Sequence, residues 1–550
     1  MTIGSGTDME WKTNALGRAI PLEIEGRKRV PFAGAFADPT GAAIAANKDI
    51  STQSGKKKLR PVPWRGKPDK LTKSWDDLFD RLDIHDGATI SFHHHLRDGD
   101  AIVLEVVKRL AERGIRNLTL APSALFSVHD ALVPYIRAGV ITKIEGSMNG
   151  AVGAACSRGE MPKTCVLRSH GGRQRAIQDG DLKIDVAFIA APCADAFGNA
   201  NGLYGKSACG PLGYPKPDSE YADKVTVITD NLVSYPCLPW AICGSNFDYV
   251  LQVESIGDSS KIVSGTTRLT RSPTQLLIAD LTARFIEAAG LMHEGFSFQA
   301  GAGGISLAAT VFLAERMRRA GVKASFAHGG ATKVLVDLLK EGLLSSIVDL
   351  QSFDLDAVRS CAENPSHVAS DPFISYGPRS AGCVASMLDV AILGATEIDL
   401  GFNVNVVTHS DGLLLHGIGG HSDAAASAGC TIITAPSFRK RIPIVREEVT
   451  TVTCPGEVVD VLVTERGIAI NPQREDLLEK AKKAGLPCIK ISELLHDVRE
   501  ITGAPELPRF KDRVVALIEW RDGSIIDVVR EIESIEHILQ NEPVNQQLQF

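Results

Sequence analysis

The chain has 550 residues, of which 44% are apolar and 23% are charged, and its net charge is −7. This length exceeds what one hydrophobic core normally supports, so it predicts two or three domains. The negative charge gives no reason to expect nucleic-acid binding, and no apolar run reaches the roughly 18 residues of a membrane helix.

Residues 1–75 show little periodic pattern, and we interpret them as an N-terminal arm. They begin with MTIGSGTDMEWKTNALGR, which lacks the layout of a signal peptide, so we expect a cytoplasmic protein. They also contain a basic, proline-containing stretch at 55–70, GKKKLRPVPWRGKPDK. This stretch either wraps a partner or another subunit, or is a solvated tail.

After the arm, strands and helices alternate. In the first half the pattern predicts strands at 89–92, 117–125 and 141–147, with helices at 101–115 and 132–140 between them. Alternating strands and helices are typical of α/β domains with a parallel sheet.

The second half shows the same order. A strand, a turn and a helix are predicted within 295–322, then a strand at 323–330, a helix at 335–343 and a strand at 344–352. In both halves the predicted helices end in glycine, as helix C-termini often do. These glycines are Gly114, Gly139, Gly321 and Gly342.

The similarity of the halves is sharpest where residues 184–202 align with residues 388–406, at a constant offset of 204. Four identical pairs stand at this offset: Asp185 and Asp389, Asp195 and Asp399, Asn199 and Asn403, and Asn201 and Asn405. Shared Asp and Asn residues are best explained as turn-forming scaffold. We therefore predict an α/β fold of two tandem domains with mostly parallel sheets, at 76–278 and 279–550.

One position breaks the repeat, because Cys193 in the first half corresponds to Glu397 in the second. Glu397 follows an apolar strand, and ligands of open α/β sheets bind outside the carboxyl ends of strands. A carboxylate there can act as a nucleophile or a general base. The structural alternatives are a cap, a turn residue or a buried ion-pair partner.

Two glycine-rich segments are candidates for binding an anion or an oxyanion through backbone N–H groups. The first, FQAGAGGIS at 298–306, lies between a predicted strand and a predicted helix, but it lacks the Rossmann spacing of glycines. The second lies in 409–436, where Gly417, Gly419 and Gly420 precede His421. His421 is either a proton carrier near Glu397 or a residue that closes the loop.

A third segment, SHGGRQRAIQDGD at 169–181, predicts a flexible, positively charged turn. Such a turn suits a phosphate-rich ligand, or it is simply solvated. His93, His94 and His95 are consecutive, so they converge poorly on one metal ion. The 11 cysteines contain no C-x-x-C pair, which favours reduced thiols and predicts no zinc site.

Together, several stretches resemble one known family, the alpha subunits of citrate lyase, within the CoA-transferase superfamily. They are TISFHHHLRDGD (89–100), SHGGRQ to PLGY (169–214), GFSFQAGAGGISLA (295–308), VDLQSFDLDAV (348–358), TEIDLGFNVNV (396–406), GIGGHSDAAASA (417–428), VDVLVTERGIAINPQR (459–474) and VVALIEWRDGSIIDVV (514–529). The resemblance runs from about residue 76 to 530 and implies two tandem CoA-transferase-like domains.

The resemblance implies a citrate CoA-transferase. Such an enzyme exchanges acetate for citrate on the thiol of an acyl carrier protein, the gamma subunit, whose prosthetic group is CoA-like. A separate beta subunit, the lyase, then cleaves the citryl thioester. The resemblance implies an oligomeric complex and no cofactor bound by this chain. From the residue pattern we expect no bound metal and no nucleic-acid or membrane partner.

Related CoA-transferases carry a glutamate that attacks the thioester, and Glu397 matches that motif. The resemblance implies that Glu397 either carries the acyl group or positions citrate in a ternary complex. Oxyanion donors are implied at Ala302 and at Gly419 or Gly420. We expect contacts to substrate and to the CoA moiety from Gln299, Gly301, Gly303, Gly304, His170, Gly171, Gly172, Arg173, Asn403, Asn405, His409 and His421.

The chain departs from the family at His409, where TGSDG is usual and this chain reads THSDG. If that backbone position has positive φ, a histidine is strained there; otherwise His409 is free to contact the tricarboxylate. Three alternative functions stay open: transfer to free CoA or thioester hydrolysis, use of citramalate instead of citrate, and a non-catalytic ligand sensor.

Overall fold

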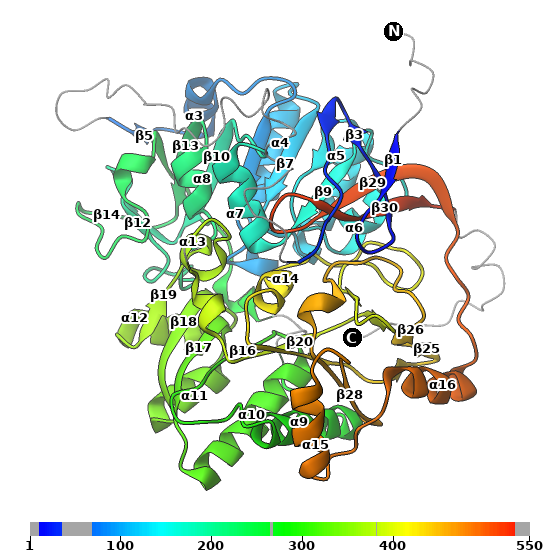
Figure 1. The fold of residues 1–550 in the computed structure, drawn as a ribbon. Helices are drawn as coiled ribbons and strands as arrows, with labels where there is room; N and C mark the ends of the chain where they lie inside the picture. Colours follow the sequence, from blue (N-terminus) through cyan, green and yellow to red (C-terminus); the bar gives the residue numbers. More distant parts are fainter. Residues whose placement is uncertain (1–9, 36–68, 264–267, 381, 534–550) are drawn as a thin grey trace.

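The computed structural model describes residues 10–35, 69–263, 268–380 and 382–533 (Figure 1). Each half of the chain contains one large sheet, and the first half lies above the second in Figure 1. The first sheet is parallel throughout, with the order β5 (Leu71–Thr72), β15 (Tyr249–Gln252), β13 (Lys224–Thr229), β10 (Val186–Ala191), β6 (Thr89–Phe92), β7 (Leu118–Pro122) and β8 (Ile141–Ile144).

The second sheet is parallel except for its last strand, which pairs antiparallel with its neighbour. Its order is β19 (His367–Ala369), β18 (Leu344–Ser352), β17 (Ala324–Ala331), β16 (Ser297–Ala300), β20 (Val390–Gly394), β23 (Cys430–Thr434), β27 (Val461–Thr464) and β28 (Gly467–Ile470). The predicted α/β fold with mostly parallel sheets is therefore confirmed.

The helices follow the predicted order. In the first half they are α3 (Trp75–Leu82), α4 (Ile102–Glu112), α5 (Val133–Arg137), α6 (Gly150–Ser157), α7 (His170–Asp179) and α8 (Lys216–Tyr221). In the second half they are α9 (Pro273–Ala288), α10 (Gly304–Ala320), α11 (Lys333–Glu341), α12 (Leu355–Glu363), α13 (Pro372–Tyr376), α14 (His421–Ala425), α15 (Glu475–Lys483) and α16 (Ile491–Thr502). All four predicted C-terminal glycines have positive φ, which a glycine adopts without a steric penalty.

The predicted repeat appears as two small sheets of the same design. One has the order β12 (Ala200–Asn201), β11 (Cys193–Asp195) and β14 (Leu232–Val233), and the other has β22 (Val404–Asn405), β21 (Glu397–Asp399) and β26 (Val445–Arg446). In each, the middle strand runs antiparallel to the first and parallel to the last, and Cys193 pairs with Asn201 as Glu397 pairs with Asn405. The offset of 204 residues thus reflects a shared local structure.

The shared aspartates accept equivalent backbone hydrogen bonds in both halves. Asp185 accepts a hydrogen bond from the N–H of Thr89, and Asp389 accepts one from Ser297, each at 2.8 Å. Asp195 accepts hydrogen bonds from the turn that follows it, including both the N–H and the side chain of Asn199. Asp399 and Asn403 repeat this arrangement. Asn403 is therefore a turn residue, although we predicted it among the ligand contacts.

Both ends of the described chain pack on the first half. The hairpin of β29 (Phe510–Glu519) and β30 (Ile525–Ile532) pairs with β9 (Cys165–Arg168), as the red and cyan strands of Figure 1 show. The N-terminal strands β1 (Trp11–Thr13) and β2 (Ala19–Pro21) lie beside this hairpin, and the Asn14 side chain donates to the carbonyl of Ile526 at 2.6 Å.

The domain bounds remain a prediction, but three features bear on them. The boundary predicted after residue 278 falls inside α9, and β5 of the first sheet lies within the segment predicted as arm. The last two strands, predicted with the second domain, hydrogen-bond to the first half. Most of the basic stretch at 55–70 lies outside the described residues.

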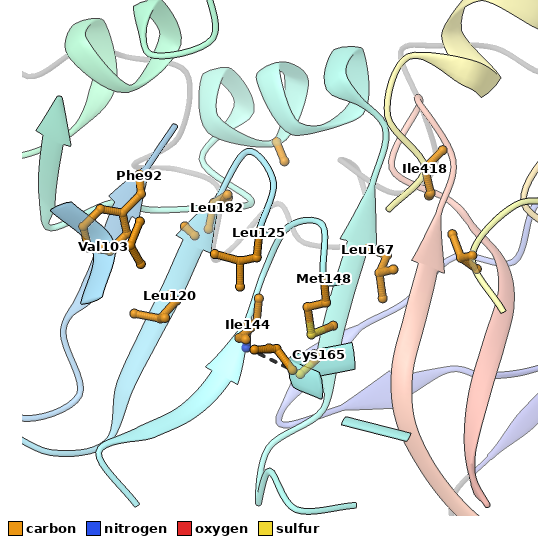
Figure 2. Close-up of a cluster of buried hydrophobic side chains, with 14 of the residues drawn as sticks. Phe92, Val103, Leu120, Leu125, Ile144, Met148, Cys165, Leu167, Leu182 and Ile418 are labelled. Atoms are coloured by element: carbon orange, nitrogen blue, oxygen red, sulfur yellow. Dashed lines mark hydrogen bonds between the residues drawn. The ribbon is translucent and has the colours of Figure 1, made fainter. Parts of the chain in front are cut away.

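One hydrophobic cluster contains residues of both halves, and a second cluster lies within the second half. Leu414 and Ile418 of the second half are buried in the same cluster as Met148 and Leu167 of the first. Figure 2 shows Ile418 with these side chains, and with Cys165, whose sulfur accepts the N–H of Ile144 at 3.4 Å. The second predicted glycine-rich segment, within 409–436, therefore packs against the first half of the chain.

Within the described part of the chain, no helix has both the length and the apolar character needed to cross a membrane. In the same part, no three His, Cys, Asp or Glu side chains are grouped so that they could hold a metal ion. All 11 cysteines are free thiols.

Gly153 provides a test of the contact between the halves. A Cβ on this residue of α6 would lie 2.1 Å from the carbonyl oxygen of Leu414. Alanine favours a helix interior over glycine by about 1 kcal/mol, but overpacking against backbone costs about 1–3 kcal/mol. We expect Gly153→Ala to lower the free energy of unfolding in urea. Gly303→Ala, where nothing lies within 4 Å of the added carbon, is the matched control and should change it little. An unchanged urea midpoint for Gly153→Ala would contradict this contact.

Candidate active site

Glu397 is the first residue of β21 and is fully buried. Its Oε1 accepts hydrogen bonds from the hydroxyls of Ser410, at 2.7 Å, and Thr450, at 3.1 Å. Its Oε2 accepts the side-chain amide of Asn405, at 2.9 Å, and the backbone N–H of Thr450, at 2.7 Å. The guanidinium of Arg446 lies 3.8 Å from Oε1.

This environment satisfies both oxygens of a buried carboxylate. A buried charge is costly unless it is hydrogen-bonded and paired, and here four hydrogen bonds and one cation surround it. Because both oxygens are occupied, a substrate can reach Glu397 only when one of these donors moves away. Ser410 is the donor that belongs to a turn with exposed residues on both sides.

The first half has no such site at the corresponding place. The sulfur of Cys193 lies 3.4 Å from the sulfur of Cys237, which also accepts the side-chain amide of Asn201 at 3.3 Å. Val233 occupies the position in β14 that Arg446 occupies in β26. The charged pair is therefore an addition to one copy of a common scaffold.

His409 starts the turn that carries Ser410. Its N–H donates to the carbonyl of Leu413, and its carbonyl accepts the N–H of Gly412, both at 2.9 Å. His409 is not among the residues with positive φ, whereas Gly412 has φ of +84°. Histidine is thus unstrained here. Its ring is exposed, with its centroid 6.2 Å from that of His416, and is available to a ligand.

The first predicted glycine-rich loop connects β16 to α10. The Oε1 of Gln299 lies 2.7 Å from the Nδ1 of His328, and its amide donates to the hydroxyl of Tyr376 at 3.2 Å. The N–H of Gly301 donates to the carbonyl of Ile392, in the middle of β20. These two residues therefore hold the loop against its neighbours.

The rest of this loop lies at the start of α10. Gly303 caps the helix and is exposed, and Gly304 is the first helical residue. The first N–H groups of a helix have no partner within it, so Ala302 and the two glycines stand where an anion could be bound.

The second glycine-rich segment is closely packed. Gly419 has φ of +63°, and its carbonyl accepts the N–H of His170 at 2.9 Å. A Cβ on Gly420 would lie 2.6 Å from the hydroxyl oxygen of Tyr376. Both positions therefore require glycine for backbone shape or close approach.

His421 contacts the end of β20, the strand that leads to Glu397. Its Nε2 donates to the carbonyl of Gly394 at 2.9 Å, so the proton resides on that nitrogen. Burial lowers the pKa of His421 to about 4, and its Nδ1 has no hydrogen-bond partner among the described residues. His421 is thus a neutral imidazole with one free acceptor, and its role as a proton carrier stays a prediction.

The prediction of a flexible, positively charged turn within 169–181 is wrong, because residues 170–179 form helix α7. Ser169 caps the helix, and its hydroxyl donates to Asp423 at 2.8 Å. Asp423, from the second half, also accepts the N–H of Gly171 at 2.8 Å. The N–H of Gly172 donates to the Ser169 hydroxyl. A carboxylate of this protein thus occupies the helix end that we had predicted for a phosphate.

The side chains of this helix are engaged as well. Arg173 is buried and forms two hydrogen bonds with Asp218, at 2.7 and 2.8 Å. The rings of His170, His94 and Tyr214 contact one another, and burial lowers the pKa of His170 to about 3. At neutral pH, His170 is uncharged and Arg173 is paired, so neither offers a free charge to a ligand.

The three consecutive histidines are buried beside this cluster. His93 and His95 face the same way, with their Nδ1 atoms 2.5 Å apart, as residues two apart on an extended chain should. His93 accepts the N–H of Ala190 at 2.8 Å, and burial lowers its pKa to about 4. These imidazoles are neutral, packed side chains.

A cavity of about 270 Å³ borders Thr450, one of the donors to Glu397. Its lining comes from the N-terminal strands, the turn that carries Ser410, the segment that carries Thr450, and the C-terminal hairpin. The charged lining residues are Arg18, Glu448, Asp527 and Arg530. The predicted N-terminal arm thus contributes Arg18 to a cavity next to the candidate site.

Sequence reasoning missed four participants: Ser410, Arg446, Thr450 and the cavity. Arg446 had no signal in the sequence, because the offset of 204 aligns it with Ile242, whereas its counterpart in the small sheet is Val233. Ser410 adjoins the predicted His409. Thr450 had no signal, since its contact with Glu397 spans 53 residues without a motif.

Comparison with known proteins places these features in one family. The family described as citrate lyase, alpha subunit, matches residues 68–532. The citrate lyase alpha chain of Klebsiella pneumoniae is 48% identical over 468 residues, which cover 84% of this chain and 92% of that one. A solved structure described as the alpha subunit of citrate lyase in complex with citrate, from Streptococcus mutans, matches with a TM-score of 0.84 and 45% identity, over 86% of this chain and 93% of that one.

A Pseudomonas malonate decarboxylase hetero-tetramer in complex with malonate has a chain that matches with a TM-score of 0.58 at 15% identity, over 79% of this chain and 87% of that one. At this identity the likeness concerns the fold alone. It supports the predicted CoA-transferase-like fold, which the closer match confirms.

The pairing of Arg173 with Asp218 can be tested by unfolding. Both side chains are at most 6% exposed, and removing one partner of a buried pair costs about 3–5 kcal/mol. We expect Arg173→Leu to lower the free energy of unfolding by that amount, and Arg173→Leu with Asp218→Leu to recover most of it. A single variant as stable as the wild type, measured in urea, would mean that Arg173 is not paired and is free for a ligand.

Proposed function

The chain belongs to the citrate lyase alpha-subunit family, and we propose that it exchanges acetate for citrate on a thioester carrier. The carrier is an acyl carrier protein with a CoA-like prosthetic group, and the products are the citryl carrier and acetate. In this proposal a lyase subunit cleaves the citryl thioester, so this chain acts within a complex of several subunits.

The observation that carries the proposal is the environment of Glu397. It is the acidic residue that one copy of the repeat has and the other lacks, and it is held by Asn405, Ser410 and Thr450. A glutamate that only stabilised the fold would be expected in both copies. A carboxylate that hydrogen bonds hold in one orientation, just after the carboxyl end of strand β20, suits acyl transfer.

The chemistry balances as two exchanges. An Oε atom of Glu397 attacks the acetyl carbon of the thioester, the C–S bond breaks, and the electron pair leaves as thiolate. The thiolate attacks the Glu397 carbonyl of the resulting anhydride and releases acetate. A citrate carboxylate then attacks the glutamyl thioester, and the returning thiolate takes the citryl group and regenerates Glu397.

Backbone N–H groups support each attack by stabilising the oxyanion. We propose Ala302 and Gly303, at the start of α10, as the donors, because the N–H of Gly301 already donates to the carbonyl of Ile392. One such donor is typically worth about 3 kcal/mol. The neutral His421 lies at the end of the strand that leads to Glu397 and accepts a proton only below its lowered pKa.

A ternary route is the second candidate. In it a citrate carboxylate attacks the acetyl thioester directly, and Glu397 positions the substrates. The complete burial of Glu397, with both oxygens hydrogen-bonded, favours this route for the closed conformation. Reduction by borohydride followed by mass spectrometry separates the two, because only the covalent route leaves a modified Glu397 after incubation with acetyl thioester.

We expect Glu397→Gln to lower citrate-dependent acetate release on the order of a thousandfold, because the amide neither attacks a thioester nor carries charge. Glu475→Gln, at an exposed carboxylate of α15, is the control and should retain full activity. Release measured with carrier thioester and with acetyl-CoA also distinguishes carrier from free CoA. Near wild-type release by Glu397→Gln would refute the role of this residue.

A further inference from the structure

We propose that Arg446 is a carboxylate-binding residue of this site, which holds a carboxylate of the substrate when Glu397 loses its negative charge. The inference rests on the proposed function, because acyl transfer to Glu397 is the event that would remove that charge. It assigns a residue that neither the motifs nor the sequence pattern identified.

The first argument is the weak pairing of a buried cation. The side chain of Arg446 is 4% exposed, and its closest approach to Glu397 is 3.8 Å, beyond hydrogen-bond distance. Its Nη1 is buried and has no hydrogen-bond partner within the described chain. Buried guanidinium groups are normally paired and hydrogen-bonded, so this one has donor capacity left for a further anion.

The second argument excludes a neighbouring acid as the missing partner. Asp399 is the register partner of Arg446 in the small sheet. Its carboxylate is turned instead to the following loop, where it accepts hydrogen bonds from Gly401 and Asn403. Among the ion pairs within the described ranges, Glu397 is the acidic partner of Arg446.

The third argument comes from the repeat. The first half forms the same small sheet with Val233 and Cys193 at the places of Arg446 and Glu397. The fold therefore does not need a charged pair here. Because both charges occur together in the second half only, they serve that half's site rather than the scaffold.

The consequence follows from electrostatics. When Glu397 forms an anhydride or a thioester, it becomes neutral and leaves Arg446 buried without a counter-ion. An uncompensated buried charge is strongly unfavourable, and a guanidinium binds a carboxylate through two parallel N–H donors. The acylated state thus attracts a carboxylate, and the free state, with Glu397 charged, repels it. Citrate and acetate both carry this group.

The cavity borders the site through Thr450, one of the donors to Glu397. It is also lined by Gly412, two residues after the donor Ser410. Neither Glu397 nor Arg446 lines the cavity, so a carboxylate that enters there reaches the charged pair only after a donor to Glu397 moves, such as Ser410 between the exposed His409 and Asp411.

Binding of citrate to variants tests the inference without any turnover. Glu397→Gln mimics the neutral state, so its dissociation constant for citrate, from isothermal titration calorimetry, should be about tenfold lower than that of the wild type. Adding Arg446→Gln should abolish this gain. The double variant replaces a buried pair by two neutral amides, which folding tolerates better than one unpaired charge. Asp460→Asn, which releases Arg474 from a partly exposed pair, is the control and should leave the affinity unchanged.

The inference fails if Glu397→Gln binds citrate no more tightly than the wild type, or if the double variant keeps the gain. A melting temperature for each variant, measured beforehand, confirms that the variant is folded. If the double variant does not fold, Arg446→Lys in the Glu397→Gln background replaces it and should retain part of the gain in citrate affinity. Acetate release by the wild type tests the proposed function separately. Normal release without the citrate gain would refute the inference alone, and the gain without release would refute the proposed function alone.

Discussion

The segment from His409 to Asp423 is the constraint on which the arrangement of this molecule depends. At its start, Ser410 donates to Glu397, and at its end, Asp423 accepts the N–H of Gly171 in the first turn of helix α7 in the other half. Between them, Leu414 and Ile418 are buried in the core of the first half. A side chain of the candidate site is thus positioned by packing between the two halves, and any change in that packing is transmitted to the carboxylate.

Duplication explains how such a site can be added at little cost to the fold. Both copies keep the aspartates that close the turns and cap the strands, so the small sheet forms without help from its central charged residues. One copy is then free to carry a buried carboxylate and a buried guanidinium. The other copy has two cysteines in contact and a valine at the related places.

Local pattern was sufficient to predict the strands, the helices and their terminal glycines, because periodicity and left-handed caps depend on neighbouring residues. Glu397 was found for a different reason: it differs from Cys193 in an otherwise similar stretch. The errors arise where distant residues decide the outcome. SHGGR reads as a turn, because glycines disfavour helices, yet Ser169 and the distant Asp423 cap it as one. Arg173 is paired with Asp218, and because Asp218 lies 45 residues away, no local pattern predicts this ion pair.

The path of the chain has one more consequence. It leaves the first half after β15 and returns to it at β29, so residues from α9 to α16 are inserted between two strands of that half. Both ends of the insertion are tethered to the same neighbour. If the contact between the halves opens to admit a substrate, the separated surfaces remain at a high effective concentration of each other and close again in the same register. The buried site can therefore open and close repeatedly without the halves drifting apart.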